Sequence, residues 1–119
     1  MMRDLPFTVS PSAAAFIAEA MQVAEAEPSF AGLVPTLTYA CNSVTFTPGG
    51  RIIDRRQAGY YQFGWHDPHQ VSDWDRFRVA GFELAVPPEV QDMLRGHNLE
   101  LEVTEGKERE SRYLVGRKY

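Results

Sequence analysis

Apolar and polar residues follow two different periods along this chain. From Leu5 to Val9 they alternate with a period of two, which predicts a short opening strand. Pro6 has no backbone N–H to donate, so we expect this strand at the edge of a sheet. Beyond Val9 the period becomes that of a helix.

The start and the end of this helix are both marked in the sequence. Ser10 is suited to the N-cap position, and Pro11 follows at the first helical position. Pro28 stops the pattern. The apolar positions that recur at helical spacing are Phe16, Ile17, Ala20, Met21 and Ala24. We therefore predict an amphipathic helix over about residues 11–27 whose apolar stripe belongs to the core.

Extended patterns dominate the rest of the chain. The predicted strands cover about residues 33–41, 44–46, 51–57, 59–65, 77–79, 82–86, 99–103 and 113–115. Residues 66–75 are polar and are predicted to be a loop. Pro87 and Pro88 open a short second helix, with Gly96 as the residue just after its end.

These elements predict an α+β fold. Strands outnumber helices and are not regularly separated by them, which favours mainly antiparallel or mixed strands over a doubly wound sheet. We expect a sandwich-like core with one long N-terminal helix and one short helix. No linker divides the chain, so residues 1–119 are predicted to form a single domain.

Composition narrows the classes of function. The net charge of −4 argues against a broad nucleic-acid surface, which needs a basic face. A lone cysteine, Cys41, excludes an internal disulfide and fits a reducing compartment. The first residues lack the apolar segment of a signal peptide, and no apolar run is long enough to span a membrane. We therefore expect a cytoplasmic protein.

Two stretches resemble the HesB-like family, the A-type iron–sulfur carriers. Residues 7–15 read FTVSPSAAA, a strand leading through a capped turn into an alanine-rich helix, which is similar to the start of these proteins. Residues 81–103 are similar to the family's segment of glycine, strand, short helix and strand. Residues 60–65 resemble the strand before that segment. The alignment requires an insertion between Cys41 and Tyr60.

This family holds iron–sulfur clusters through one cysteine after the early strand and a Cys-x-Cys pair near the carboxyl terminus. Cys41 lies close to the first position, but residues 113–119 contain no cysteine. The resemblance thus implies a HesB-like fold that has lost the carrier site and acts as a non-catalytic interaction or structural module with no cofactor. Its partner would be another protein, and a homodimer is compatible with this hypothesis.

The alternative is a divergent carrier of iron or of a [2Fe–2S] cluster. A dimer would present two copies of Cys41, joined by His66, by His69 or by the thiol of glutathione. Cys41 has a simpler interpretation as a packed strand residue, since Leu37, Tyr39 and Cys41 share one face of a predicted strand.

Two further groups of residues are candidates for a site. His66 and His69 carry metal-binding imidazoles in one loop, although Pro68 between them prevents a helix from presenting both on one face. The aromatic residues within 60–65 are suited either to a ligand-binding face or to the core, and the core is the preferred interpretation.

No pattern in the sequence predicts an enzyme. There is no glycine-rich phosphate loop and no nucleophile elbow. The acidic residues cluster in charged turns, where water keeps carboxyl groups ionised, whereas general acid catalysis needs an apolar setting.

Overall fold

The computed structural model describes residues 5–41, 43–46, 49–50, 52–56, 59–105 and 110–118. The strands are β1 (Thr8–Val9), β2 (Val34–Ala40), β3 (Ser43–Phe46), β4 (Ile52–Arg56), β5 (Tyr60–His66), β6 (Asp75–Val79), β7 (Phe82–Val86), β8 (His97–Glu105) and β9 (Glu110–Lys118). The α-helices are α1 (Pro11–Glu25) and α2 (Pro88–Leu94), and short 3₁₀ turns span Pro28–Phe30 and Pro68–Val71. The fold is therefore mixed α+β, as predicted.

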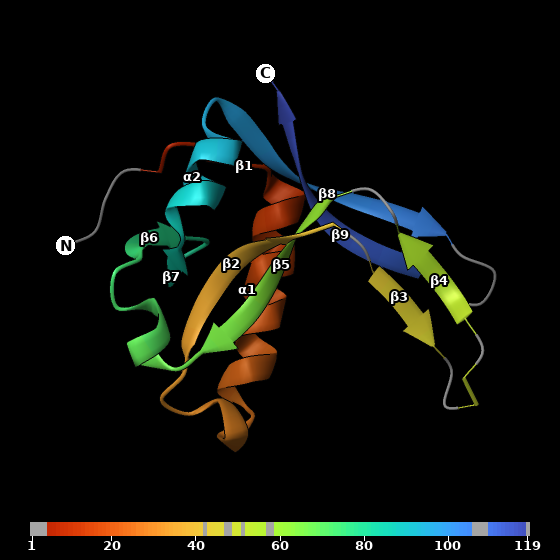
Figure 1. Ribbon diagram of the computed structural model, residues 1–119, viewed down its shortest axis with the longest axis horizontal. Coiled ribbons are helices and arrows are strands. Elements are labelled where there is room, and N and C mark those ends of the chain that lie inside the picture. The colour runs from red at the N-terminus through yellow and green to blue at the C-terminus, as the bar shows by residue number, and fades with distance from the viewer. Residues whose placement is uncertain are drawn as a thin grey trace.

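Seven strands form one nearly closed sheet in the order β1-β8-β9-β5-β2-β7-β6 (Figure 1). The β1–β8 and β2–β7 pairs are parallel, and the other pairs in this sheet are antiparallel. The sequence led us to expect a sandwich-like core. Instead, the strand order is continuous within this sheet, and the two helices complete the core that it surrounds. β1 is an edge strand, as Pro6 indicated, but it contains only two residues.

Helix α1 begins where the sequence predicted. The Ser10 hydroxyl accepts a hydrogen bond from the backbone N–H of Ala13 at 3.2 Å, and Pro11 occupies the first turn. The helix ends at Glu25, slightly before the predicted boundary at residue 27, and Pro28 starts the 3₁₀ turn. Four of its residues are buried against the core: Ala13, Ile17, Met21 and Ala24.

The core lies between α1, α2 and the inner face of the sheet. Its buried members are Phe7, Ala13, Ile17, Met21, Leu37, Tyr61, Phe77, Val79, Leu84, Val86, Val90, Leu94, Leu99 and Leu114. Gly96 follows α2 with a φ of +72°, the left-handed conformation predicted for a residue just after a helix. All the longer elements of the seven-stranded sheet thus meet in one apolar cluster.

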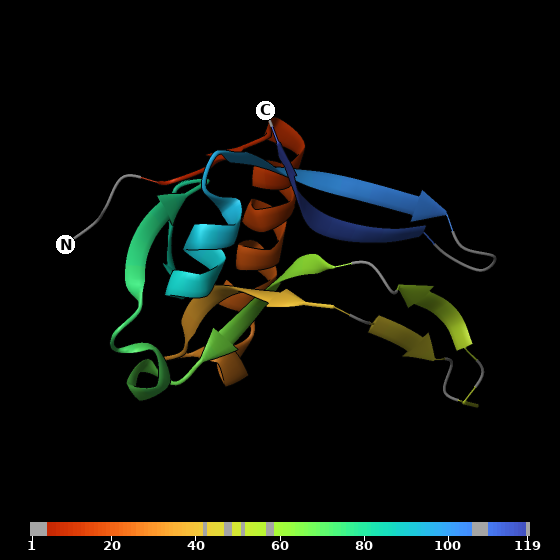
Figure 2. The same cartoon turned by 45° about the horizontal axis from the view of Figure 1, so that its top comes forward.

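The β3–β4 pair stands apart from this sheet. It forms its own two-stranded antiparallel sheet, and both views place it to one side of the main body (Figures 1 and 2). The described strands β8 and β9 extend toward the same side of the molecule. The hairpin therefore adds to the fold without interrupting the order of the other seven strands.

Residues 66–75 contain more regular structure than the loop that the sequence predicted. The Asp67 carboxylate accepts a hydrogen bond from the backbone N–H of His69 at 2.9 Å, and the Gln70 side chain accepts one from Asp67 N–H at 3.1 Å. These reciprocal bonds cap a 3₁₀ turn that buries Val71 completely.

Candidate functional site

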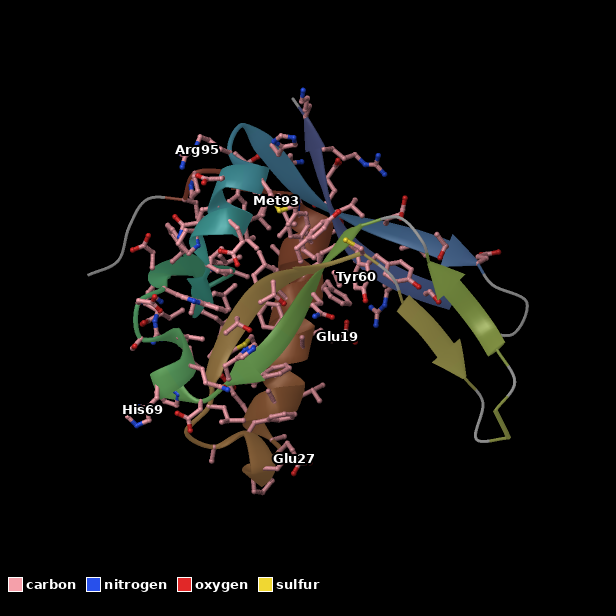
Figure 3. The ribbon with its side chains drawn as sticks, viewed as in Figure 1. Glu19, Glu27, Tyr60, His69, Met93 and Arg95 are labelled. Carbon is pink, nitrogen blue, oxygen red and sulfur yellow. The ribbon has the colours of Figure 1, made fainter. Side chains whose placement is uncertain are left out.

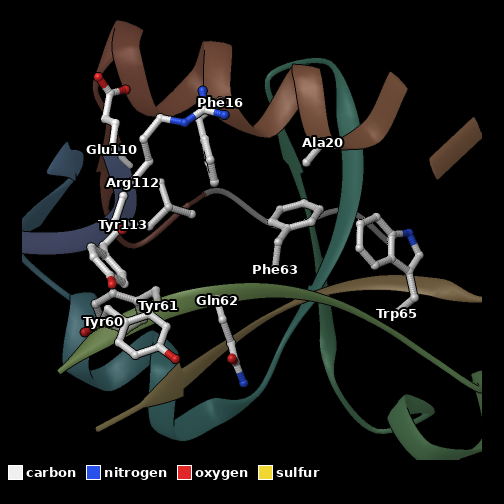
Figure 4. Close-up of a pocket in the computed structure, with 12 residues that line it drawn as sticks. Phe16, Ala20, Tyr60, Tyr61, Gln62, Phe63, Trp65, Glu110, Arg112 and Tyr113 are labelled. Carbon is white, nitrogen blue, oxygen red and sulfur yellow. The ribbon is translucent and has the colours of Figure 1, made fainter. Parts of the chain in front are cut away.

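A groove runs beside α1 where the helix faces β5 and β9 (Figure 4). Its main part has a volume of about 570 Å³, and two adjoining hollows of about 330 Å³ and 260 Å³ continue it toward the end of α1. Trp65 lines all three. The main part is lined by Phe16, Ala20, Tyr60, Tyr61, Gln62, Phe63, Trp65, Glu110, Ser111, Arg112, Tyr113 and Leu114.

The helix side of the groove comes from a second apolar stripe on α1. Phe16, Ala20 and Val23 are spaced at i, i+4 and i+7, next to the stripe that is buried in the core. Phe16 and Ala20 are half-buried, and Val23 is 65% exposed. Since Ala20 carries only a methyl group, space remains between the helix and the sheet at this position.

Aromatic rings form the sheet side. Phe63 and Trp65 lie two residues apart on one face of β5, and both point toward α1 (Figure 4). Trp65 stacks on Phe30 with ring centroids 4.7 Å apart and meets the edge of Phe63 at 5.7 Å. Tyr60 and Tyr113 make a similar edge contact at 5.3 Å between the neighbouring strands β5 and β9. These contacts hold the rings in place while leaving them partly exposed.

Charged residues border the apolar surface. The Arg112 guanidinium lies 5.2 Å from the Phe16 ring centroid and 3.3 Å from a carboxylate oxygen of Glu19. Glu110 lines the β9 end of the groove, and Glu25 and Glu27 line the opposite end. Both side chains of the Arg112–Glu19 pair are well exposed, so the pair orients the arginine and adds little stability.

Tyr61 forms part of the floor and is neutral at ordinary pH. Burial raises the pKa of its hydroxyl above the usual value, and the neighbouring Tyr39 hydroxyl acts in the same direction. The Tyr39 and Tyr61 rings make an edge contact at 5.2 Å. The floor of the groove therefore adds no negative charge to that of its rim.

Cys41 lies outside this groove and is exposed. It follows β2, along which burial falls from Leu37, which is inaccessible, to Tyr39, which is 38% exposed. The interpretation of Cys41 as a packed core residue is therefore wrong. Cys41 comes after the last residue of β2, beyond the part of this strand that packs into the core.

His66 and His69 have different surroundings. His66 Nδ1 lies 2.9 Å from the hydroxyl of the buried Thr36, and its ring lies 5.8 Å from that of Trp74. His69 is exposed in the 3₁₀ turn (Figure 3). Within the described part of the chain, no three histidine, cysteine, aspartate or glutamate side chains are grouped as metal ligands. A metal site at these histidines stays a prediction.

The aromatic segment divides between the two interpretations open to it. Tyr61 is buried and forms part of the groove floor, whereas Tyr60, Phe63 and Trp65 are half-buried along its lining. Phe16 packs against the core, as its helical spacing predicted, and also lines the groove. The sequence interpretation missed Glu19 and Arg112, which lie 93 residues apart and meet only in the folded chain. The one local signal for the groove itself was the width of the apolar surface on α1.

No protein-family model and no curated protein matches this chain. Among the described residues, neither helix has the length and apolar character needed to cross a membrane. The chemistry of the groove is therefore the basis for a functional proposal.

Proposed function

We propose that this chain is a non-catalytic binding module on a HesB-like scaffold, and that the groove beside α1 binds a segment of a partner protein. The observation that carries this proposal is the aromatic lining formed by Phe16, Phe63 and Trp65, which pack against the core on one side and stay partly exposed on the other. Full burial of an aromatic side chain is strongly favourable because it removes a large apolar area from water. A continuous groove that leaves them accessible is typical of an interaction site.

The arrangement of elements supports the HesB-like part of the proposal. A strand and a helix come first, followed by several strands, a short helix and two final strands, which is the order that the resemblance implies. The resemblance also needs an insertion between Cys41 and Tyr60. The β3–β4 hairpin occupies that interval and stands outside the seven-stranded sheet, so its presence is compatible with the family's core arrangement.

The polar groups of the groove support binding over catalysis. Arg112 is paired with Glu19, and the described carboxylates on the rim are open to water. General acid catalysis needs a carboxyl group in an apolar site, and nucleophilic catalysis needs a nucleophile beside a base. The described lining residues include neither a histidine nor a cysteine.

Peptide selection on a random displayed library tests this proposal. Ala20→Trp is expected to fill the groove, whereas Ala15→Trp places the same side chain on an exposed part of α1 that lines none of the three hollows. We expect selected peptides to bind the wild type and Ala15→Trp similarly, and to bind Ala20→Trp at least about tenfold more weakly, a loss of about 1.4 kcal/mol. Peptides that bind both variants equally would exclude the groove as the site. Circular dichroism checks that each variant is folded.

The exposure of Cys41 favours a second candidate function. Two copies of Cys41 in a homodimer, in a reducing cytoplasm, would contribute to an iron or [2Fe–2S] site whose remaining ligands come from His66, His69 or glutathione. Anaerobic reconstitution with ferrous iron and sulfide tests this function. This second function predicts bound iron and a visible charge-transfer band in the wild type, both lost in Cys41→Ala. Wild-type protein that retains no iron after desalting would rule the carrier function out.

A further inference from the structure

We propose that the segment bound by the groove is basic and amphipathic, with an apolar centre and lysine or arginine residues on both sides. This inference rests on the proposed binding function and adds the chemical class of the partner. It follows from two features of the described residues: the apolar lining is aromatic, and the charges around it are mainly negative.

The negative charges lie at both ends of the groove. Glu110 lies at the end of the groove formed by β9. Glu25 and Glu27 lie at the other end, beside the 3₁₀ turn at Pro28–Phe30. Figure 3 places Glu19 partway along α1 and Glu27 beyond the end of the helix. An acidic partner would bring like charges together at both ends, whereas a basic partner would pair with them.

The one described cation in the lining is already engaged. Arg112 pairs with Glu19 and lies over the Phe16 ring, so its charge is balanced within the groove. This contact also shows that the groove wall accepts a guanidinium group on an aromatic face. Lysine and arginine side chains of a partner would pack their aliphatic stems on exposed rings in the same way and direct their charged ends to the rim.

The length of the groove limits the apolar centre. Phe16 and Glu25 mark its two ends on α1, and this stretch of helix is about 14 Å long at about 1.5 Å per residue. An extended chain advances about 3.3 Å per residue, so about four residues span this distance. Basic residues directly before and after those four would reach the carboxylates at the ends.

A single-tryptophan protein provides the readout. Trp74 makes a tilted ring contact with His66, with centroids 5.8 Å apart, and does not line the groove, so Trp74→Phe leaves Trp65 as the only tryptophan. The probes are two octapeptides with the same four apolar central residues, one flanked by lysine pairs and the other by glutamate pairs. We expect the lysine peptide to shift the Trp65 emission and to bind about tenfold or more tightly than the glutamate peptide at low salt. Added salt should reduce this difference.

Removing charge from the rim gives the matched control. Glu25→Gln combined with Glu27→Gln should weaken the binding of the lysine peptide about threefold to tenfold, since exposed ion pairs are individually weak. Glutamine at position 27 keeps the oxygen that accepts a hydrogen bond from Ser29 N–H. Glu89→Gln, on the separate helix α2, should leave the affinity unchanged.

The outcomes separate this inference from the proposed function. Equal or tighter binding of the glutamate peptide, blocked by Ala20→Trp, would overturn the basic partner and keep the groove as a binding site. Lysine-peptide binding that is insensitive to the rim variant would also overturn it. If neither these probes nor any selected peptide depends on the groove, the proposed function fails as well.

Discussion

Replacing Ile17 by alanine is expected to lower the free energy of unfolding by about 2–5 kcal/mol. Ile17 is inaccessible to solvent and belongs to the core between α1 and the sheet. Its truncation removes apolar contacts and leaves a cavity that the packed neighbours fill only in part. A protein of this size is stabilised by about 5–15 kcal/mol in total, so this loss is large. Urea unfolding followed by circular dichroism measures it.

The control is Val23→Ala on the same helix. Val23 belongs to the stripe beside the groove and is 65% exposed, so its truncation should change the free energy of unfolding by less than about 0.5 kcal/mol. Alanine has a higher helix propensity than valine, and this gain in stability offsets part of the loss of apolar contacts. Equal losses in the two variants would contradict the division of α1 into a buried stripe and a groove-lining stripe.

Gly116→Ala is expected to destabilise the fold by about 1–3 kcal/mol. A Cβ atom at position 116 would lie 2.9 Å from Leu94 Cδ2 and 3.4 Å from Tyr61 Cε2. Leu94 is completely buried in α2, so its Cδ2 methyl group would have to shift within the packed core. The methyl group would therefore push α2 away from β9 or displace Tyr61 from the floor of the groove. Thermal or urea unfolding measures the cost.

Gly64→Ala provides the comparison for this glycine. It also lies within a strand, but a Cβ atom there would be 3.5 Å from Thr36 Oγ1, an ordinary contact distance. We expect stability within about 0.5 kcal/mol of the wild type, with a small gain from the reduced flexibility of the unfolded chain. If Gly116→Ala were equally harmless, the close approach of α2 to β9 would be incorrect.

Much of the local structure was predictable because it depends on neighbouring residues. Ser10 and Pro11 determine the start of α1 through a side-chain cap and a preset φ angle. Gly96 ends α2 because its φ of +72° is easily reached without a side chain. The β6–β7 hairpin turns at Ala80 and Gly81, which have φ values of +53° and +85°. The sequence located this break between two extended pieces.

The candidate site was less predictable. Helical spacing placed Phe16 with the core residues, and the aromatic content of β5 favoured burial of Trp65. Both side chains are apolar, and nothing near them in the sequence says how closely α1 approaches β5. Their partial exposure results from the packing of the whole sheet against the other face of the helix. Hydrophobic patterning specifies which residues can be buried, and packing decides which of them are.

Local interactions let the sequence by itself determine the elements of this protein: the capped helix α1, the short helix α2 and most of the successive strands. These depend on caps, turns and periodicity over a few residues. The tertiary structure decided which strands are neighbours, such as β1 pairing in parallel with β8 across Thr8 and Asn98. It also decided that Arg112 meets Glu19 and Phe16 beside an aromatic groove. Such contacts join residues distant in the chain, and their geometry arises only when the sheet closes around its core.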